Sequence, residues 1–160
     1  MAELNELKAY LETHNIDVWE YVEPTTTAMA AANAVGCSVA EIAKTLLFVV
    51  GGKPVIVVTC GDMKVKSSHL KKISGLTGKV KLPKTDEVLN YTGYAPGGVC
   101  PFLLPADLPI FLDQSLQRFP VVYAAAGNNH SAVPVSVAQL EQLTGGRLAA
   151  LCESIPEENG

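Results

Sequence analysis

The sequence predicts an α+β fold with a mostly antiparallel or mixed sheet, and three observations support this prediction. The chain has 160 residues, the length of one domain, and neither a linker nor an internal repeat divides it. Apolar residues make up 48% of the chain and charged residues 18%, enough apolar surface to bury a core. The predicted strands come in hairpins and runs, without a steady alternation of strand and helix.

Two helices are predicted near the N-terminus. Leu4, Leu7 and Leu11 recur at helical spacing, which predicts an amphipathic helix within the first 14 residues. The threonines at 25–27 can cap a second, alanine-rich helix that ends near Gly36.

A hairpin follows. Ser38 and Glu41 form a capping box, which predicts a short helix that runs into Lys44. The periodicity then changes, and two apolar runs at 45–50 and 55–59, separated by a glycine-containing turn, predict two buried strands.

The second half is predicted to mix short helices and strands. Serine or threonine caps and closing glycines predict the helices, and apolar runs predict the strands. The expected helices are 67–74, 86–90 and 137–143, and the expected strands are 109–113, 121–126 and 133–135. The tail over 153–160 is expected to fray.

Several protein classes are excluded or disfavoured. Apolar runs are too short to span a bilayer, and the acidic start lacks the order of a secretory signal. Four dispersed cysteines without a C-x-x-C pair indicate a reduced, cytoplasmic protein, and no histidine has partners at metal-ligand spacing. No glycine-rich nucleotide-binding motif occurs. We therefore expect no metal, no cofactor and neither a membrane nor a DNA partner.

Charge is unevenly distributed along the chain. Residues 1–43 hold seven acidic side chains and one lysine, whereas residues 44–84 hold nine lysines and one aspartate. A basic middle in a protein of net charge −4 is either a solvated face or a surface that meets phosphates.

The least ordinary segment is 93–102, Gly-Tyr-Ala-Pro-Gly-Gly-Val-Cys-Pro-Phe. Its glycines and prolines predict a fixed loop whose backbone amides can approach a ligand, as in an anion nest or an oxyanion hole, or else a structural connection. Lys44 is either a lysine at the end of an element or a side chain pointing into a site. His130 lies in a polar break that is typical of a turn.

Two nucleophilic arrangements can be written from the residue types, but neither has a supporting motif. Ser115, His130 and Asp113 would make a hydrolytic triad, although no nucleophile elbow surrounds the serine. Cys100 and His130 would make a thiol–imidazole pair without any spacing rule to support it.

Five motifs in series resemble the YbaK family, an aminoacyl-tRNA deacylase domain that also occurs as the editing insertion of bacterial prolyl-tRNA synthetases. The resemblance covers residues 25–143, about three quarters of the chain, and implies a twisted central sheet surrounded by helices. The motifs are Ala43–Phe48, Gly61–Val65, Thr92–Phe102, Asp113–Leu116 and Tyr123–Gly127.

The resemblance also implies which residues form the site. Lys44 matches the site lysine of the family, and Gly97 and Pro101 match the ends of its Gly-x-x-x-Pro loop, so these three and Gly98 are the expected catalytic residues. The expected substrate-binding residues are Thr45, Val99, Cys100, Gly127, Asn128 and His130. Because relatives often carry other residues at 100 and at 128–130, the amino acid recognised is left open.

The implied function is that of a free-standing trans-editing hydrolase that deacylates mischarged tRNA. A small amino acid such as cysteine, alanine or serine is expected, with tRNA-Pro favoured, and the partners would be the acceptor end of an aminoacyl-tRNA and a synthetase. The ester that joins an amino acid to tRNA is reactive, so a positioned water molecule and stabilisation of the oxyanion suffice for its hydrolysis. The alternatives are a non-catalytic module that binds tRNA or a synthetase on the same fold, and a hydrolase of a small ester or a nucleotide-like ligand.

Overall fold

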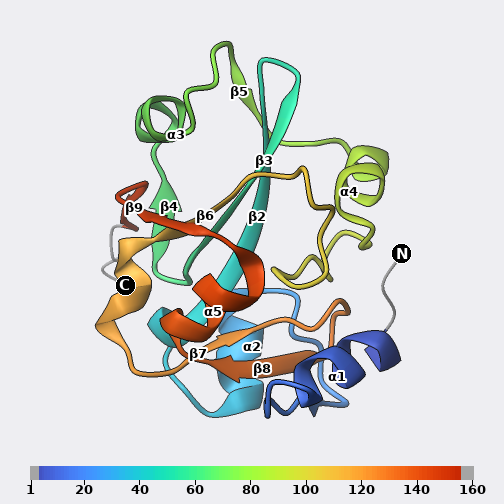
Figure 1. Ribbon diagram of the computed structural model, residues 1–160. Coiled ribbons are helices and arrows are strands. Elements are labelled where there is room, and N and C mark those ends of the chain that lie inside the picture. Colours follow the sequence, from blue (N-terminus) through green and yellow to red (C-terminus); the bar gives the residue numbers. More distant parts are fainter. Residues whose placement is uncertain (1–3, 156–160) are drawn as a thin grey trace.

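A computed structural model describes residues 4–155 of the protein (Figure 1). The helices within these residues are α1 (Leu4–Glu12), α2 (Ala28–Val35), η1 (Val39–Glu41), α3 (Ser67–Ser74), α4 (Thr85–Thr92), η2 (Gln114–Arg118) and α5 (Val137–Thr144). The strands are β1 (Trp19–Glu20), β2 (Ile42–Val50), β3 (Lys53–Cys60), β4 (Met63–Val65), β5 (Val80–Lys81), β6 (Ile110–Asp113), β7 (Val122–Ala124), β8 (Ser131–Val135), β9 (Arg147–Ala149) and β10 (Cys152–Ser154).

The main sheet is mixed, which confirms the predicted fold class. Its strands follow the order β1-β8-β7-β2-β3-β6-β9, and β5 also pairs with β2. The long β2–β3 hairpin is antiparallel, whereas β7 runs parallel to β2 and β6 runs parallel to β3. A separate two-stranded sheet joins β10 to β4.

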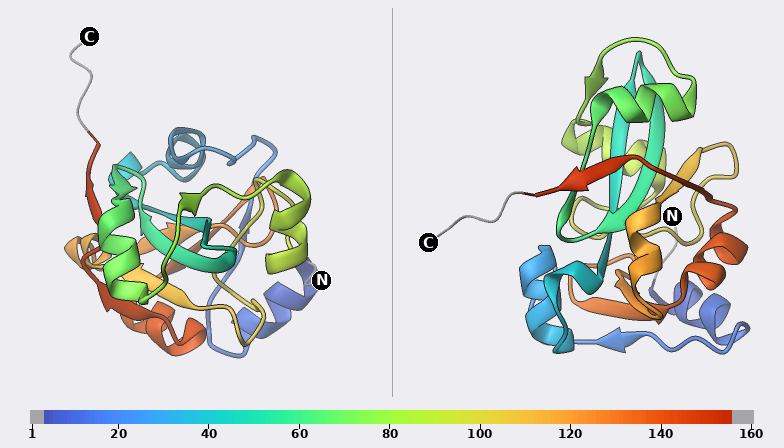
Figure 2. Two further views of the ribbon diagram at one scale, coloured as in Figure 1. Left: turned by 90° about the horizontal axis from the view of Figure 1, so that it is seen from above. Right: turned by 90° about the vertical axis from the view of Figure 1, so that its left-hand side faces the viewer.

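Helices cover both faces of this sheet. The right-hand view of Figure 2 shows α2 on one side of β7 and β8, with α1 and α5 on the other. Leu7 of α1 and Leu140 of α5 are fully buried in the largest apolar cluster. On the opposite face of the sheet, Ala31 and Ala32 of α2 pack on Ile42. Burial of these apolar faces is the main force that holds the layers together.

The local signals placed most elements correctly. Thr27 caps α2, since its side chain accepts a hydrogen bond from Ala30 N–H at 3.0 Å, and Gly36 ends the helix with φ +85°. The capping box of Ser38 and Glu41 is present, but the helix it starts ends at Glu41. β2 then begins at Ile42, so Lys44 lies inside a strand and not at the end of a helix.

The short strands β1, β4, β5, β9 and β10 had no signal in the sequence, because strands of two or three residues depend on a distant partner. One consequence concerns the C-terminal segment. Glu153 and Ser154 were expected to belong to a frayed tail, yet they pair with Lys64 and Met63 of β4. Residues 156–160 of the expected tail lie outside the described residues.

Across residues 4–155, none of the helices combines the length and the apolar character that crossing a bilayer requires.

Candidate functional site

The candidate site lies where one edge of β2 lacks a strand partner. β3 pairs with β2 over residues 43–50 on one edge. On the other edge, β7 pairs with 42–43 and β5 pairs with 49–50. Residues 44–48 therefore face a gap between β7 and β5 that no described strand fills. Gly61 N–H donates to Ile42 O at 2.8 Å, and the alternation of an antiparallel ladder then directs the backbone N–H and C=O of Thr45 into this gap.

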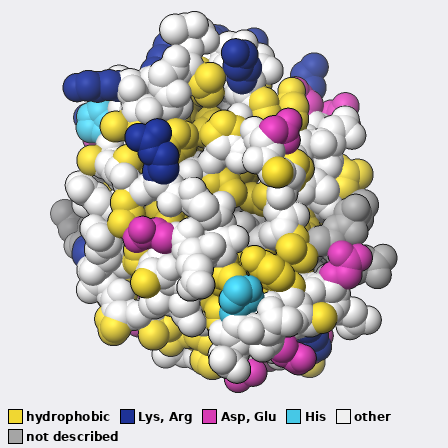
Figure 3. Space-filling view, viewed as in Figure 1, with side chains coloured by type: hydrophobic (Ala, Val, Ile, Leu, Met, Phe, Trp, Pro, Cys, Tyr) yellow, Lys and Arg dark blue, Asp and Glu magenta, His cyan; other side chains and the backbone are white. Residues whose placement is uncertain are grey.

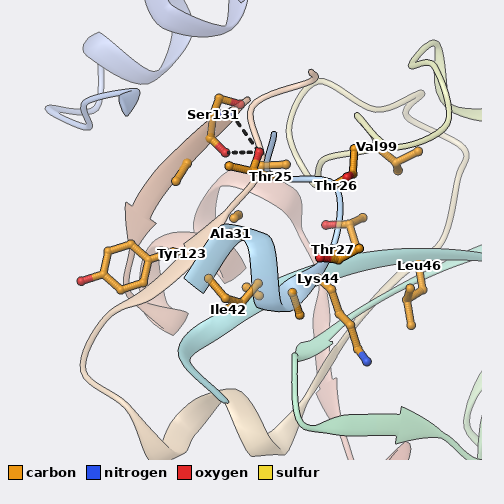
Figure 4. A pocket seen from close by; sticks show the side chains of 17 residues that line it. Thr25, Thr26, Thr27, Ala31, Ile42, Lys44, Leu46, Val99, Tyr123 and Ser131 are labelled. Atoms are coloured by element: carbon orange, nitrogen blue, oxygen red, sulfur yellow. Dashed lines mark hydrogen bonds between the residues drawn. The ribbon is translucent and has the colours of Figure 1, made fainter. Parts of the chain in front are cut away.

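A pocket of about 280 Å³ opens at the gap (Figure 4). Its walls come from the segment that leads into α2, from the first half of β2, from the 93–102 loop, and from β7 and β8. The lining residues are Thr25, Thr26, Thr27, Ala28, Ala31, Ile42, Ala43, Lys44, Thr45, Leu46, Gly97, Val99, Tyr123, Ala124, Ala125, Ser131 and Ala132.

One wall is held by hydrogen bonds between segments far apart in the sequence. Ser131 N–H donates to Thr25 Oγ1 at 3.1 Å, and the same hydroxyl donates to Ser131 O at 3.3 Å. Both residues are buried, and Ser131 Oγ also accepts from Ala126 N–H at 3.0 Å. The segment before α2 is thereby fixed to the start of β8.

Lys44 projects from β2 at the other side of the pocket. Figure 4 shows its side chain extending away from Thr27, with its nitrogen directed away from the three threonines. The side chain is half-buried, and this burial lowers the pKa of its ammonium group, although nearby Cys152 and Asp62 partly oppose the shift. Lys44 forms no ion pair within 4 Å with a described residue. Its ammonium is therefore available to an anionic ligand.

Asp62 is an acidic residue near Lys44, but its carboxylate is already paired with Arg118. Arg118 Nη2 and Nη1 donate to its two carboxylate oxygens at 2.7 and 3.1 Å. This two-point contact with the guanidinium lowers the pKa of Asp62. The carboxylate therefore stays negatively charged, and its ion pair is with Arg118 and not with Lys44.

Thr45 contributes a hydroxyl without a protein partner. Its Oγ1 is buried and accepts or donates no hydrogen bond among the described residues. Leaving such a group unpaired costs about 1–3 kcal/mol, so a ligand that binds it recovers that energy. Thr45 and Lys44 point to opposite faces of β2, and both line the pocket because the gap passes beside the strand.

The two glycines of the loop have different neighbours. Gly97 lines the pocket with φ +85°, and a Cβ there would lie 3.3 Å from Thr26 Cγ2. Gly98 N–H donates to Ala95 O at 3.0 Å, closing a turn. A Cβ on Gly98 would lie 2.9 Å from Gly127 O, so this glycine lets the loop pack directly on the 127–128 backbone.

The other end of the loop faces away from the pocket. Cys100 is fully buried, its Sγ donates to Phe102 O at 3.7 Å, and burial raises the pKa of its thiol to about 11. Pro101 lines a separate cavity of about 240 Å³ together with Tyr10 and Leu143. Cys100 thus lacks the lowered pKa of a nucleophilic thiol.

The 127–130 segment forms a tight turn beside the loop. Gly127 has φ +82°, and a Cβ there would lie 2.8 Å from Tyr94 Cε1. His130 N–H donates to Asn128 Oδ1 at 3.0 Å, and the His130 ring lies 3.0 Å from Asn129 Oδ1. None of Gly127, Asn128 and His130 lines the pocket wall.

The structure therefore gathers Lys44, Thr45, Gly97 and Val99 around one cavity and places the other six candidates behind or beside it. It also adds Thr25, Tyr123 and Ser131, which the sequence analysis did not single out. The run of three threonines was the available signal, because only Thr27 is needed to cap α2.

Neither nucleophilic arrangement forms. Asp113 uses its carboxylate to accept from the backbone N–H groups of Ser115, Leu151 and Cys152 at 3.1, 2.9 and 3.2 Å. His130 contacts asparagine side chains instead of Ser115 or Cys100. Within residues 4–155, no group of three or more histidine, cysteine or acidic side chains is placed to hold a metal ion.

Comparison with known proteins finds relatives that match most of this chain and a synthetase that matches part of it. "Uncharacterized protein YwhH" of Bacillus subtilis (strain 168) is 36% identical over 129 residues, covering 80% of this chain and 81% of that protein. The "Putative Cys-tRNA(Pro)/Cys-tRNA(Cys) deacylase EbsC" of Enterococcus faecalis (strain ATCC 700802 / V583) is 27% identical and covers 88% of both chains. Proline--tRNA ligase of Staphylococcus aureus (strain Newman) is 32% identical over 91 residues, only 16% of its length.

A solved structure has the same fold over nearly the whole chain. The crystal structure of "a putative trans-editing enzyme for prolyl tRNA synthetase" superposes on this structure with a TM-score of 0.84 at 30% sequence identity, covering 96% of this chain and 99% of that one. The family model described as "Aminoacyl-tRNA editing domain" matches residues 22–143, which include the whole pocket. The protein therefore belongs to the aminoacyl-tRNA editing domain family.

Proposed function

We propose that the protein is a free-standing trans-editing hydrolase that removes a wrongly attached amino acid from tRNA. The observation that carries the proposal is the meeting of a half-buried ammonium, an unpartnered hydroxyl and a glycine-lined backbone segment around one pocket, from Lys44, Thr45 and Gly97. These are the groups that the ester at the 3′ end of an aminoacyl-tRNA would need.

In the proposed reaction, water adds to the carbonyl carbon of the ester. The bond between that carbon and the ribose oxygen breaks, and the products are the free amino acid and a tRNA with its terminal hydroxyl restored. The Lys44 ammonium binds the terminal phosphate or ribose, and the backbone N–H of Gly97 stabilises the oxyanion, because the N–H of Gly98 already donates to Ala95 O. The Thr45 hydroxyl orients the ester or the attacking water.

No side-chain nucleophile is needed for this step. The free 2′-hydroxyl of the terminal ribose, or the thiol of a cysteinyl ester, can assist from the substrate itself. Val99 and Tyr123 would contact the amino-acid side chain or the ribose. Cys100, Pro101, Gly127, Asn128 and His130 would act indirectly, by holding the loop and the turn behind it.

The proposed substrate is cysteinyl-, alanyl- or seryl-tRNA, with tRNA-Pro favoured. Two relatives support this choice: one is named as a putative Cys-tRNA(Pro)/Cys-tRNA(Cys) deacylase, and the other as a putative trans-editing enzyme for prolyl-tRNA synthetase. A synthetase partner is proposed on the same ground.

A panel of alanyl-, cysteinyl-, seryl- and prolyl-tRNA, measured side by side against a no-enzyme control, tests the proposal. We expect at least one mischarged tRNA to be deacylated well above the control rate. If tRNA binds but no ester is hydrolysed faster than the control, the protein is a non-catalytic tRNA-binding module and the proposal fails. Hydrolysis of small esters with no salt dependence would instead indicate that tRNA is not the substrate.

A further inference from the structure

The backbone of Thr45 presents one donor and one acceptor to the gap beside β2. The bond from Gly61 N–H to Ile42 O sets the alternation of the β2–β3 ladder, and at Thr45 both backbone groups point away from β3. Pro54 fits the same alternation, because it has no N–H and pairs with Val49 at a position where β3 directs no donor toward β2. Two independent features therefore leave Thr45 N–H and C=O unbonded to β3.

Neither neighbouring strand reaches these two groups. β7 pairs with β2 only as far as Ala43, and β5 pairs with it from Val49 onward. The ladder between β5 and β2 cannot extend further, because the residue that would lie opposite Leu47 is Pro83, which has no N–H to donate. Among residues 4–155, Thr45 N–H and C=O thus have no backbone partner.

The gap admits a short extended group but no continuous strand. It spans residues 44–48, about 17 Å of β2, and β7 and β5 occupy the same edge at its two ends. In an antiparallel ladder, one residue can exchange two hydrogen bonds with the residue opposite it, N–H to C=O and C=O to N–H. An amino acid esterified through its carboxyl group keeps an α-amino group and a carbonyl. It therefore carries the two groups that would complete the bonding of Thr45.

The pocket wall offers an α-ammonium group neutral acceptors instead of a carboxylate. None of the described residues that line the pocket is acidic. Figure 3 also shows hydrophobic and uncharged surface over the middle of the molecule, where β2 runs in the same view (Figure 1). The hydroxyls of Thr25 and Thr27 already accept bonds from backbone N–H groups. The carbonyl of Thr45 is an open acceptor in this wall.

We infer that the aminoacyl group binds as a one-residue strand against Thr45. Its α-ammonium group donates to Thr45 C=O. Thr45 N–H donates to the ester carbonyl, where it joins Gly97 N–H at the oxygen on which negative charge develops. The Lys44 nitrogen is directed away from the three threonines, so it stays free for a phosphate or the ribose (Figure 4). The inference rests on the proposed function and deepens it, because it makes a free α-amino group a requirement for a good substrate.

The first experiment varies the ester and leaves the protein unchanged. The best substrate of the panel is compared with two analogues that carry a hydroxyl or a hydrogen in place of the α-ammonium group. For alanyl-tRNA these analogues are 2-hydroxypropionyl- and propionyl-tRNA. Because an α-ammonium group also speeds spontaneous hydrolysis, each kcat/KM is divided by the no-enzyme rate constant of the same ester.

We expect this ratio to fall by about 10- to 150-fold when hydrogen replaces the ammonium group, as for the loss of a hydrogen bond to a charged group. The hydroxyl analogue should lie between the other two, because it keeps a neutral donor. Equal ratios for the ammonium and hydrogen esters would overturn the inference.

The second experiment locates the contact and needs no turnover. The ligand is adenosine that carries the amino acid through a 3′ amide in place of the ester, and its control is the same amide without the α-ammonium group. At saturation with the first ligand, we expect hydrogen exchange at Thr45 N–H to slow by at least about tenfold and the carbonyl carbon resonance of Thr45 to shift. The control ligand should slow the exchange but leave the carbonyl resonance near its position in the free protein. Leu46 N–H faces β3 and should be equally protected in every state.

Two variants at one position separate the N–H from the hydroxyl of Thr45. Thr45→Val keeps the backbone N–H, whereas Thr45→Pro removes it, and an edge position whose N–H bonds to nothing tolerates proline. We expect kcat/KM of Thr45→Pro to fall at least about tenfold below that of Thr45→Val, the effect of one further lost hydrogen bond. Equal kcat/KM in two folded variants would contradict a role for the N–H. If the proline variant does not fold, hydrogen exchange at Thr45 in the wild type decides the question.

The outcomes separate this inference from the proposed function. If no ester is hydrolysed, the proposed function fails, yet slower exchange at Thr45 N–H in the presence of the amide ligand would still support the binding mode. If esters are hydrolysed while the α-substituent has no effect and exchange at Thr45 does not change, the function stands and the inference is wrong.

Discussion

Thr25 and Ser131, which are 106 residues apart, exchange two hydrogen bonds through a single hydroxyl group. The Thr25 hydroxyl accepts from Ser131 N–H and donates to Ser131 O, and both residues are buried beside the pocket. A contact of this kind joins two segments that share no helix or hairpin, and it therefore determines where one wall of the pocket stands.

Replacing Thr25 with valine should destabilise the fold. Valine has nearly the same shape, so no cavity forms, but Ser131 N–H is left buried without its acceptor. We expect a loss of about 1–3 kcal/mol in the free energy of unfolding. Urea denaturation followed by circular dichroism measures it. Thr26→Val is the control, because Thr26 is exposed and should change stability by no more than about 0.5 kcal/mol. Equal midpoints for both variants would contradict the assigned role.

Lys44→Ala should lower kcat/KM on aminoacyl-tRNA by about 10- to 150-fold, the cost of a lost charge-assisted hydrogen bond of about 1.5–3 kcal/mol. The fold should remain, since the side chain is only half-buried. A fully active, folded Lys44→Ala protein would remove this residue from the site.

The pH dependence of substrate binding should report the lowered pKa of Lys44. The charged form binds phosphate, so affinity should fall as the pH rises through that pKa, before an ordinary lysine near 10.4 would titrate. Binding of a tRNA with a non-hydrolysable aminoacyl amide, measured from neutral pH to about pH 10, follows this loss. Lys44→Arg keeps its charge over the whole range, and its affinity should not fall. The same alkaline decrease in both proteins would assign the titration to another group.

Gly97→Ala should impair catalysis more than its effect on stability explains. Gly97 and Gly145 both have positive φ, +85° and +68°, so alanine at either position costs about 1–2 kcal/mol of backbone strain. A Cβ at Gly145 meets nothing within 4 Å, whereas one at Gly97 enters the pocket wall near Thr26. Thermal unfolding and kcat/KM, measured on both variants, separate the two effects. A similar kcat/KM in Gly97→Ala and Gly145→Ala would argue against a role for this loop in the reaction.

Cys100→Ser should keep kcat/KM within about fivefold of the wild type, a change of about 1 kcal/mol. Burial raises the pKa of the thiol to about 11, so almost none of it is thiolate at neutral pH. Single-turnover deacylation with intact-protein mass spectrometry provides the measurement. A folded Cys100→Ser protein without turnover, together with an aminoacyl thioester trapped on the wild type, would show that Cys100 is the nucleophile.

The sequence by itself determined the elements whose signals are local. Thr27 begins α2 and Gly36 ends it. The apolar runs around the Gly51–Gly52 turn form the β2–β3 hairpin, and the capping box of Ser136 and Gln139 begins α5. A cap or a turn involves residues within a few positions of one another, so its chemistry can be read directly from the chain. The motif series also identified the family, because it samples the whole fold.

The tertiary structure alone decided how the site is assembled. Lys44 was expected at the end of a helix, but pairing with Thr59 of β3 placed it inside a strand. The gap that admits a ligand exists because β7 and β5 cover the two ends of one edge of β2 and leave its middle free. Strand register between distant segments, like the contact between Thr25 and Ser131, depends on how separate apolar faces pack together, and no local pattern of residues encodes that arrangement.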